Sequence, residues 1–403
     1  MSPEKVKKNA GPVMVCLDGS PDAEAASDLA LEYARVQGLP MVAAHVYDAA
    51  IHESRFREME PGLPDKYQDK AGLKELRDSH GTLMSDGFNA LSRGYMERFL
   101  KTAAEAEIKV EAVVEEGRNY VGLQNIAMRI KPSMIAMGAA GLGDLDDGIM
   151  GSTAARLLRS VSCDLLIGRA TAPSGGAILT GIDGSGDALE ASKAAMVFAK
   201  INGSPLALVA AYDPELHQRV FKAMADTMPP EAQEAVGLDK QQDLHESLID
   251  DGLGTLYQTF LDEAKGLALA SGADPAVHLV ADKGYRGIIR KADEVTASLI
   301  CLGRFGHNRE DGSPIGATAE NVARLARCHV LIKAPAAGDI LTESTDASAL
   351  AWDPDALERL EKAPRFVRKM AKKSIEKAAL AEGAHRVTVK HVDMVSERFR
   401  GKK

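Results

Sequence analysis

Short apolar runs alternate along the chain with longer segments in which apolar residues recur every three or four positions. The runs are continuous rather than alternating, a pattern typical of strands that helices cover on both faces of a parallel sheet. Five runs fall in the first half of the chain and five in the second. The predicted strands are 13–17, 41–46, 110–114, 134–138 and 163–168, then 177–182, 206–211, 276–280, 298–303 and 328–333.

The two halves of the chain repeat one another at a constant offset of 165 residues. Asp18-Gly19-Ser20 recurs as Asp183-Gly184-Ser185, and Gly138 recurs as Gly303. Duplication of one domain explains an offset that holds from the first strand to the last. We therefore predict two doubly wound α/β domains, each with a five-stranded parallel sheet, at residues 1–170 and 171–336.

Each copy also holds a long segment between its second and third strands, 49–109 and 214–274. These segments exceed what a plain crossover helix requires. Apolar residues recur in them at helical spacing, which predicts a long amphipathic helix preceded by a shorter helical or loop arm. The helix after the first strand is expected to begin at Ser20 as its N-cap, with Pro21 in the first helical position.

Composition is that of a globular protein, with 45% apolar and 27% charged residues. The apolar runs are too short to span a bilayer, and the first nine residues carry no apolar stretch, so we expect no membrane contact and a cytoplasmic location. The four cysteines stand singly, which fits neither a disulfide framework nor a CxxC metal site.

Charge is distributed unevenly. Residues 352–403 hold 14 Lys and Arg against 8 Asp and Glu, and the net charge of −9 therefore leaves −15 for residues 1–351. An acidic body argues against nucleic acid as a partner, because phosphate binding depends on clustered Lys and Arg. The basic tail suits an acidic protein partner.

A glycine-rich motif follows the fourth predicted strand. It has the form G-x2-G-x9-G-S, at Gly138, Gly141, Gly151 and Ser152, with Thr153 next. Glycines at a strand tip let backbone amides approach a ligand, and the start of the next helix offers unpaired N–H groups to an anion. Asp18, at the tip of the first strand, would face the same crevice and accept from ribose hydroxyls.

These features resemble the universal stress protein family, whose members bind ATP with such a loop and with an Asp that closes the first strand. The resemblance covers residues 10–336 in two copies. It implies that Asp18 and Val46 flank the adenosine, that Gly138 and Gly141 line the ribose and phosphate, and that Gly151 with Ser152 holds the distal phosphates. It further implies a regulatory protein that binds ATP or AMP with slow hydrolysis at most, built as an intramolecular pseudo-dimer, with further homodimerisation left open.

Two departures from the family pattern bear on the ligand. Asp144, Asp146 and Asp147 stand between the glycines, and carboxylates beside a triphosphate require a divalent cation or outward rotation, so Mg²⁺ remains an open co-ligand. The second copy lacks the hydroxyl residue after its third glycine, where Ala317 stands. Its candidate nucleotide-binding residues are Asp183, Gly303, Gly306, Gly316 and Thr318.

Other chemistries find less support. His52 and His80 recur as His217 and His245, but no companion ligand stands at helical spacing, so a repeated structural contact is favoured over a metal site. No nucleophile with a base partner is evident, and we assign no catalytic residue. The alternative function is a nucleotide-free scaffold that recruits a partner through its helical arms and basic tail.

The last part of the chain has its own signature. A linker at 337–351 precedes Trp-x-Pro-x-Ala at 352–356 and Pro-x-Phe-Val-Arg at 364–368. This run resembles the small C-terminal domain of the B subunit of light-independent protochlorophyllide reductase. It predicts a basic three-helix module at 352–403, with helices from Pro354, over 365–382 and over 387–399. The reductase chemistry is not implied, because the tail contains no cysteine for an iron–sulfur cluster.

Overall fold

A computed structural model describes residues 11–64, 67, 69–143, 150–213, 216–238, 251–307, 309, 312–335, 351–361, 371–372, 375–376, 378–379, 384 and 386–400. The chain divides into two compact units, Met1–Ala336 and Ala337–Lys403. The predicted linker, except for its last residue, lies outside the described residues, as does most of the predicted helix over 365–382.

One ten-stranded sheet runs through the first unit, in the order β3-β2-β1-β4-β5-β10-β9-β6-β7-β8. Neighbouring strands are parallel within each copy, and β5 pairs antiparallel with β10 where the copies meet. Every predicted run contains an observed strand whose ends lie within two residues of the prediction. The strands are β1 (Val13–Cys16), β2 (Met41–Tyr47), β3 (Val110–Glu116), β4 (Met134–Gly138), β5 (Asp164–Gly168), β6 (Ala177–Gly181), β7 (Leu206–Tyr212), β8 (Ala276–Ala281), β9 (Ala297–Gly303) and β10 (His329–Lys333).

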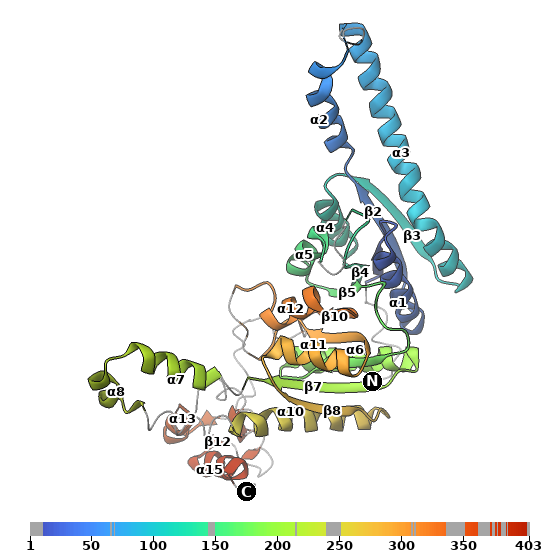
Figure 1. Cartoon of the computed structure of the whole chain (residues 1–403). Coiled ribbons are helices and arrows are strands. Elements are labelled where there is room, and N and C mark those ends of the chain that lie inside the picture. Colours follow the sequence, from blue (N-terminus) through green and yellow to red (C-terminus); the bar gives the residue numbers. More distant parts are fainter. Residues whose placement is uncertain are drawn as a thin grey trace. The chain divides into compact units, whose positions relative to one another are not determined.

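Helices cover both faces of this sheet, as the continuous apolar runs predict (Figure 1). One face packs against α4, α5, α11 and α12, and the other against α1, α3, α6 and α10. The doubly wound α/β architecture is therefore confirmed. The helices are α1 (Pro21–Gln37), α2 (Ala49–Met59), the 3-10 turn η3 (Glu60–Gly62), α3 (Lys70–Glu105), α4 (Asn119–Ile130), α5 (Ser152–Ser160), α6 (Gly186–Asn202), α7 (Leu216–Thr227), α8 (Pro230–Val236), α10 (Asp251–Ala270), α11 (Gly284–Glu294) and α12 (Ala317–Leu325).

The duplication appears in three dimensions as a two-fold relation between the copies. Leu166 of β5 pairs with Leu331 of β10, which is its own counterpart at the 165-residue offset. A pair of equivalent residues can face each other across a two-fold axis only if that axis passes between them. The two domains of one chain thus join as a symmetric dimer would.

The turn from β1 into α1 forms as the sequence predicts. Ser20 caps α1 by accepting a hydrogen bond from the Ala23 amide at 3.2 Å, and Pro21 occupies the first helical position. Gly19 before it has a φ of +78°, which L-residues rarely adopt. A β-carbon there would also lie 2.5 Å from the ring of Tyr95. This turn places Asp18 at the edge of the sheet.

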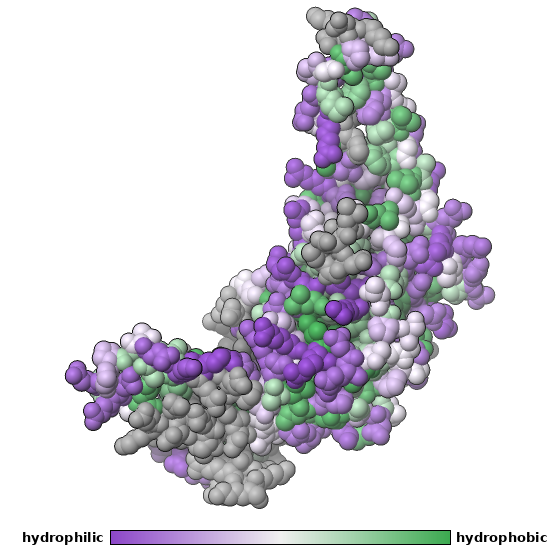
Figure 2. All heavy atoms as spheres, in the orientation of Figure 1, coloured by the Kyte–Doolittle hydropathy of each residue, from purple (hydrophilic) through white to green (hydrophobic). Residues whose placement is uncertain are grey.

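Both predicted long segments contain a long helix preceded by shorter ones. In the first copy α2 and α3 form an arm that extends away from the sheet (Figure 1). Hydrophobic side chains are visible along this arm (Figure 2). Leu83 on α3 and Met59 at the end of α2 are 63% and 67% exposed. In the second copy α7 and α8 precede α10.

The second unit has a small hydrophobic core of its own, which contains Ala356, Leu360, Ile375, Ala379, Val387, Val392 and Val395. Helix α13 spans Pro354–Glu361 and α15 spans Val389–Arg400. A short parallel pair of strands was not predicted: β11 (Ala351–Trp352) precedes α13, and β12 (Arg386–Val387) precedes α15. Trp352 donates a hydrogen bond from Nε1 to Glu376 at 2.9 Å.

Candidate functional site

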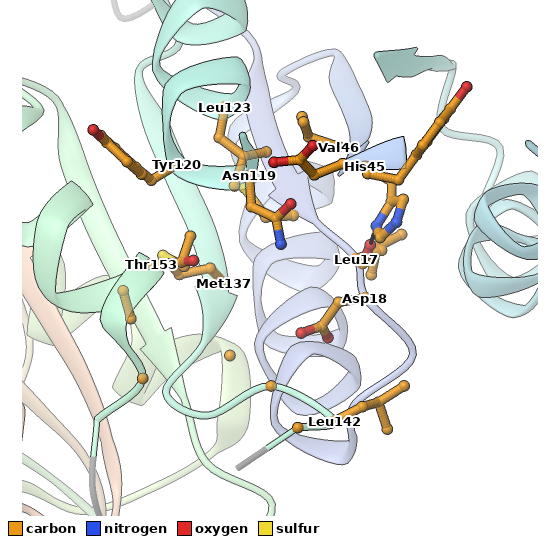
Figure 3. A pocket seen from close by; sticks show the side chains of 18 of the residues that line it. Leu17, Asp18, His45, Val46, Asn119, Tyr120, Leu123, Met137, Leu142 and Thr153 are labelled. Carbon is orange, nitrogen blue, oxygen red and sulfur yellow. Dashed lines mark hydrogen bonds between the residues drawn. The ribbon is translucent and has the colours of Figure 1, made fainter. Parts of the chain in front are cut away.

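A cavity of about 850 Å³ opens at the carboxyl ends of β1, β2 and β4 in the first domain. All seven residues that the sequence singles out in the first copy line it (Figure 3). They come from the tips of β1 and β2, the loop after β4 and the start of α5. The residues are Asp18, Val46, Gly138, Gly141, Gly151, Ser152 and Thr153.

The inner wall of the cavity is apolar. Its side chains, almost all of them buried, come from three neighbouring strands and from α4, and they are Cys16, Ala44, Val46, Leu123 and Met137. Val46 occupies the space that Gly122 leaves open, because a β-carbon at Gly122 would lie 2.6 Å from Val46 Cγ1. Burial raises the pKa of the Cys16 thiol, so this sulfur stays neutral. Such a wall suits the flat apolar faces of an aromatic ring.

Asp18 offers one carboxylate oxygen to the cavity. Its Oδ1 accepts hydrogen bonds from the Ser20 amide at 3.0 Å and the Ser20 hydroxyl at 2.6 Å. None of the described residues donates to its Oδ2, and the side chain points toward the cavity in Figure 3. Gly141 keeps this oxygen accessible, because a β-carbon there would lie 2.9 Å from Oδ2.

The glycine-rich loop differs in one respect from the expectation that its backbone amides are bare. The Ala140 amide donates to the Asp22 carboxylate at 3.1 Å, and the Gly151 amide donates to the Ala139 carbonyl at 2.8 Å. Gly138 is likewise required by packing, since a β-carbon would lie 2.7 Å from the Ala23 nitrogen. These groups shape the loop and do not remain free for an anion.

The start of α5 supplies further donors at the cavity. Gly151 is its N-cap with no side-chain cap, and the first intrahelical bond runs from the Ala155 amide to the Gly151 carbonyl. The amides of Ser152, Thr153 and Ala154 therefore lack intrahelical acceptors. They lie at the positive end of the helix dipole and border the cavity, an arrangement that favours an anion.

Two arginines that were not predicted from the sequence also line the cavity. Arg118 precedes α4, and Arg156 lies one turn into α5 with its guanidinium 4.4 Å from the Tyr120 ring centroid. Both are exposed, and neither forms an ion pair with a described residue. Neither arginine belongs to the glycine-rich motif, so the motif gives no signal for them, and their charge reaches the cavity from the start of α4 and from α5.

His45 also lines the cavity and was not predicted. It interrupts the apolar run of β2, and its Nδ1 hydrogen-bonds the Leu17 carbonyl at 2.5 Å. Burial lowers the pKa of His45, partly opposed by the hydrogen bond to Leu17. The ring is therefore neutral at pH 7 and carries its proton on Nδ1, because a carbonyl only accepts.

The corresponding crevice of the second domain is arranged differently. Asp183 follows β6 as Asp18 follows β1, but its Oδ2 accepts a hydrogen bond from the His307 amide at 2.8 Å. Gly303 ends β9, Gly306 lies in the loop beside Asp183, Gly316 caps α12, and Thr318 is in its first turn. The Asp183 carboxylate is thus hydrogen-bonded to the glycine-rich loop of its own domain.

Several predictions fall where the structure does not describe the chain. Asp144, Asp146 and Asp147 lie outside the described residues, as does His245, and nothing is described of the side chains of His52 and His217. The His80 ring stacks on Phe56 with centroids 4.6 Å apart, a structural contact. Within the described ranges no cluster of His, Cys, Asp or Glu could hold a metal ion, and no helix is long and apolar enough to cross a membrane.

Two family models match parts of the chain. The model of the universal stress protein family matches residues 10–169 and again 176–333. The chain belongs to the universal stress protein family. Residues 352–395 match the model described as the proto-chlorophyllide reductase 57 kD subunit, so this family member carries a module similar to part of that subunit. No curated protein matches the chain.

Solved structures give similar proteins at low identity. A universal stress protein from Archaeoglobus fulgidus is 16% identical over 81% of this chain and 98% of its own, with a TM-score of 0.48. A functionally unknown protein from Pseudomonas aeruginosa is 15% identical over 82% and 95%, with a TM-score of 0.49. A universal stress protein in complex with cAMP is 24% identical over 40% and 100%, with a TM-score of 0.27.

Proposed function

We propose that the first domain of this universal stress protein binds an adenine nucleotide, ATP or AMP, and that the protein acts in the cytoplasm as a regulator of stress or energy state. One observation carries the proposal: the Oδ2 of Asp18, to which no described residue donates, and the start of α5 border the same cavity. The first is an acceptor for ribose hydroxyls and the second is a donor set for phosphates.

The remaining walls suit the other parts of such a ligand. The apolar wall around Ala44, Val46 and Leu123 accommodates an adenine ring, and about 850 Å³ lies within the usual range of small-molecule sites. Arg118 and Arg156 add positive charge at the cavity. The cavity therefore offers an apolar wall, a carboxylate oxygen and backbone donors, the three kinds of group that an adenine nucleotide requires.

The proposal assigns one nucleotide to each chain. In the second domain both oxygens of the Asp183 carboxylate already accept hydrogen bonds, from Ser185 and from the His307 amide. A ribose hydroxyl would have to compete with these donors for Asp183. We therefore place the site in the first domain.

Titration calorimetry with ATP, AMP and adenosine, each with and without Mg²⁺, tests this assignment. Asp18→Ala should lower the affinity for all three ligands by about tenfold, because it removes a charged hydrogen-bond acceptor. Asp183→Ala is the matched control, since Asp183 holds its serine cap in the same way, and it should leave binding unchanged. The absence of binding to the wild-type protein would refute the proposal, and phosphate release from ATP would reveal turnover.

A second candidate function, as a scaffold, is favoured by the arm formed by α2 and α3. Leu83 and Leu91 are 63% and 46% exposed on α3, and Met59 is 67% exposed at the end of α2. Exposed side chains of this size on one projecting element are typical of an interaction surface. If the arm recruits a partner, Leu83→Glu should abolish complex formation while Thr82→Glu preserves it, with nucleotide affinity unaffected in both.

For residues 352–403 of the C-terminal unit we propose docking to an acidic protein surface, on the basis of the 14 Lys and Arg against 8 Asp and Glu in this segment. Deletion of residues 340–403 should leave nucleotide affinity intact and abolish a salt-sensitive pulldown of the partner. A pulldown that survives the deletion would refute this role.

A further inference from the structure

Two buried arginines reach across the boundary between the two domains. Arg304, in the glycine-rich loop of the second domain, donates from Nη1 to the Leu158 carbonyl of α5 at 2.8 Å. Arg169, which follows β5 in the first domain, donates from Nη2 to the Ala323 carbonyl of α12 at 3.0 Å. The two side chains are only 2% and 5% exposed. Each guanidinium thus ends on a helix that belongs to the other domain.

The two carbonyls occupy equivalent places. Leu158 and Ala323 are counterparts at the 165-residue offset, each near the last turn of a nine-residue helix. Carbonyls there lack intrahelical donors and form the negative end of the dipole, where a cation is stabilising. Each arginine therefore donates to the C-terminal end of a helix, α5 or α12, whose N-terminal end follows a glycine-rich loop.

The arginines themselves are not products of the duplication. The counterpart of Arg304 is Ala139, and that of Arg169 is Ala334. Each domain thus contacts the other through an arginine, and the two arginines stand at positions that the duplication does not relate. This arrangement allows the two contacts to be removed separately.

Arg304 combines two tasks. Its backbone carbonyl accepts from the Gly316 amide at 2.9 Å at the start of α12, while its side chain holds the end of α5. Its Nε and Nη2 have no hydrogen-bond partner within the described part of the chain. The hydrogen bond to the Leu158 carbonyl is therefore the interaction through which this guanidinium holds α5.

We infer that Arg304 is a positioning residue for the nucleotide site of the first domain: by holding the C-terminal end of α5 it sets where the free amides of Ser152 and Thr153 lie against the ligand phosphates. The inference rests on the proposed nucleotide binding. A nine-residue helix is about 13 Å long, so Arg304 acts on the phosphates through the helix and not by contact. The second domain thereby controls phosphate recognition in the first.

The test compares Arg304→Met with Arg169→Met, which removes the equivalent contact to α12. Methionine keeps much of the side-chain volume and removes the buried charge, so both variants should fold. Arg304→Met should weaken ATP binding by about tenfold while adenosine binding changes less than twofold, because helix-terminus effects act on the phosphates. Arg169→Met should bind both ligands as the wild type does, and Arg304→Lys should recover part of the ATP affinity.

A measurement without nucleotide separates this inference from the proposed function. Hydrogen exchange of the amides at 155–160 in α5 should accelerate in Arg304→Met, and that at 320–325 in α12 should accelerate in Arg169→Met. If wild-type protein binds no ATP, the proposed function fails, and the exchange pattern still decides whether Arg304 holds α5. Unchanged exchange in α5, or equal losses of ATP and adenosine affinity in Arg304→Met, would overturn the inference.

Discussion

Tyr33 of α1 stacks on Phe198 of α6, its own counterpart in the second copy, with ring centroids 5.1 Å apart and ring planes 18° apart. This contact lies on the opposite side of the sheet from the crossed arginines, since the rings belong to the face that α1 and α6 cover. Together with the pairing of Leu166 and Leu331, it places the two-fold axis through the sheet and through the helix layer formed by α1 and α6.

Truncation of Phe198 should show how strongly this junction stabilises the first unit. The side chain is fully buried, so Phe198→Ala should lower the free energy of unfolding by about 3–5 kcal/mol. Val36→Ala on α1 is a suitable control, because Val36 is 45% exposed and should change it by less than about 0.5 kcal/mol. Urea unfolding followed by circular dichroism measures both, and equal small losses would contradict the assigned packing.

The closeness of Gly141 to Asp18 predicts a specific loss of binding. Gly141→Ala places a β-carbon 2.9 Å from Asp18 Oδ2, which forces the carboxylate to move. We expect nucleotide affinity to fall by about tenfold, since the charged acceptor leaves its position. Gly143→Ala, two residues along the same loop, meets nothing within 4 Å and should bind normally. Calorimetric titrations that give the same affinity for both variants would show that Asp18 does not meet the ligand.

The two cavity arginines predict how affinity depends on the number of phosphates. Arg118→Ala and Arg156→Ala should each weaken ATP binding by about three- to tenfold and AMP binding less, because ATP carries more negative charge. The effect should shrink as salt rises, since both side chains are exposed. Arg129→Ala on α4 is the control, because Arg129 pairs with Glu115 and does not line the cavity. Equal losses for ATP and AMP would place these arginines away from the phosphates.

His329 predicts an acid limit on the stability of the first unit. Its Nδ1 accepts a hydrogen bond from the Arg169 amide at 3.1 Å, which requires the unprotonated ring. Burial is the main cause that lowers the pKa of His329 to about 4, from an ordinary value near 6.5. The unfolded chain therefore takes up the proton first, and stability that is complete above pH 6.5 is lost as the pH falls toward 4.

The loss amounts to roughly 3 kcal/mol in total, because one pKa unit corresponds to about 1.4 kcal/mol. Urea unfolding at pH 7.0, 5.5 and 4.5 measures it. His329→Gln should be less stable than the wild type at pH 7 and should lose less stability between pH 7 and 4.5. If His329→Gln loses as much stability between pH 7 and 4.5 as the wild type does, the pH dependence comes from other groups.

The sequence by itself determined the fold class, the duplication and seven of the residues that line the cavity in the first domain. Continuous apolar runs indicate that a strand is covered on both faces, and a constant offset of 165 residues indicates that one domain occurs twice. The glycine motif and Asp18 lie at strand ends, and parallel strands bring their carboxyl ends to one edge, so their convergence on one cavity follows from topology.

Only the tertiary structure decided which groups at that edge stay free. Asp18 and Asp183 occur in the same sequence motif, yet the His307 amide occupies one carboxylate and no described residue occupies the Oδ2 of the other. The roles of Arg118 and Arg304 could not be predicted from the sequence around them. Arg118 lines the cavity and Arg304 binds α5, and both placements depend on residues that are distant in the chain. Sequence periodicity reports which face of an element is buried, whereas the pairing of individual polar atoms depends on distances that only the packed chain fixes.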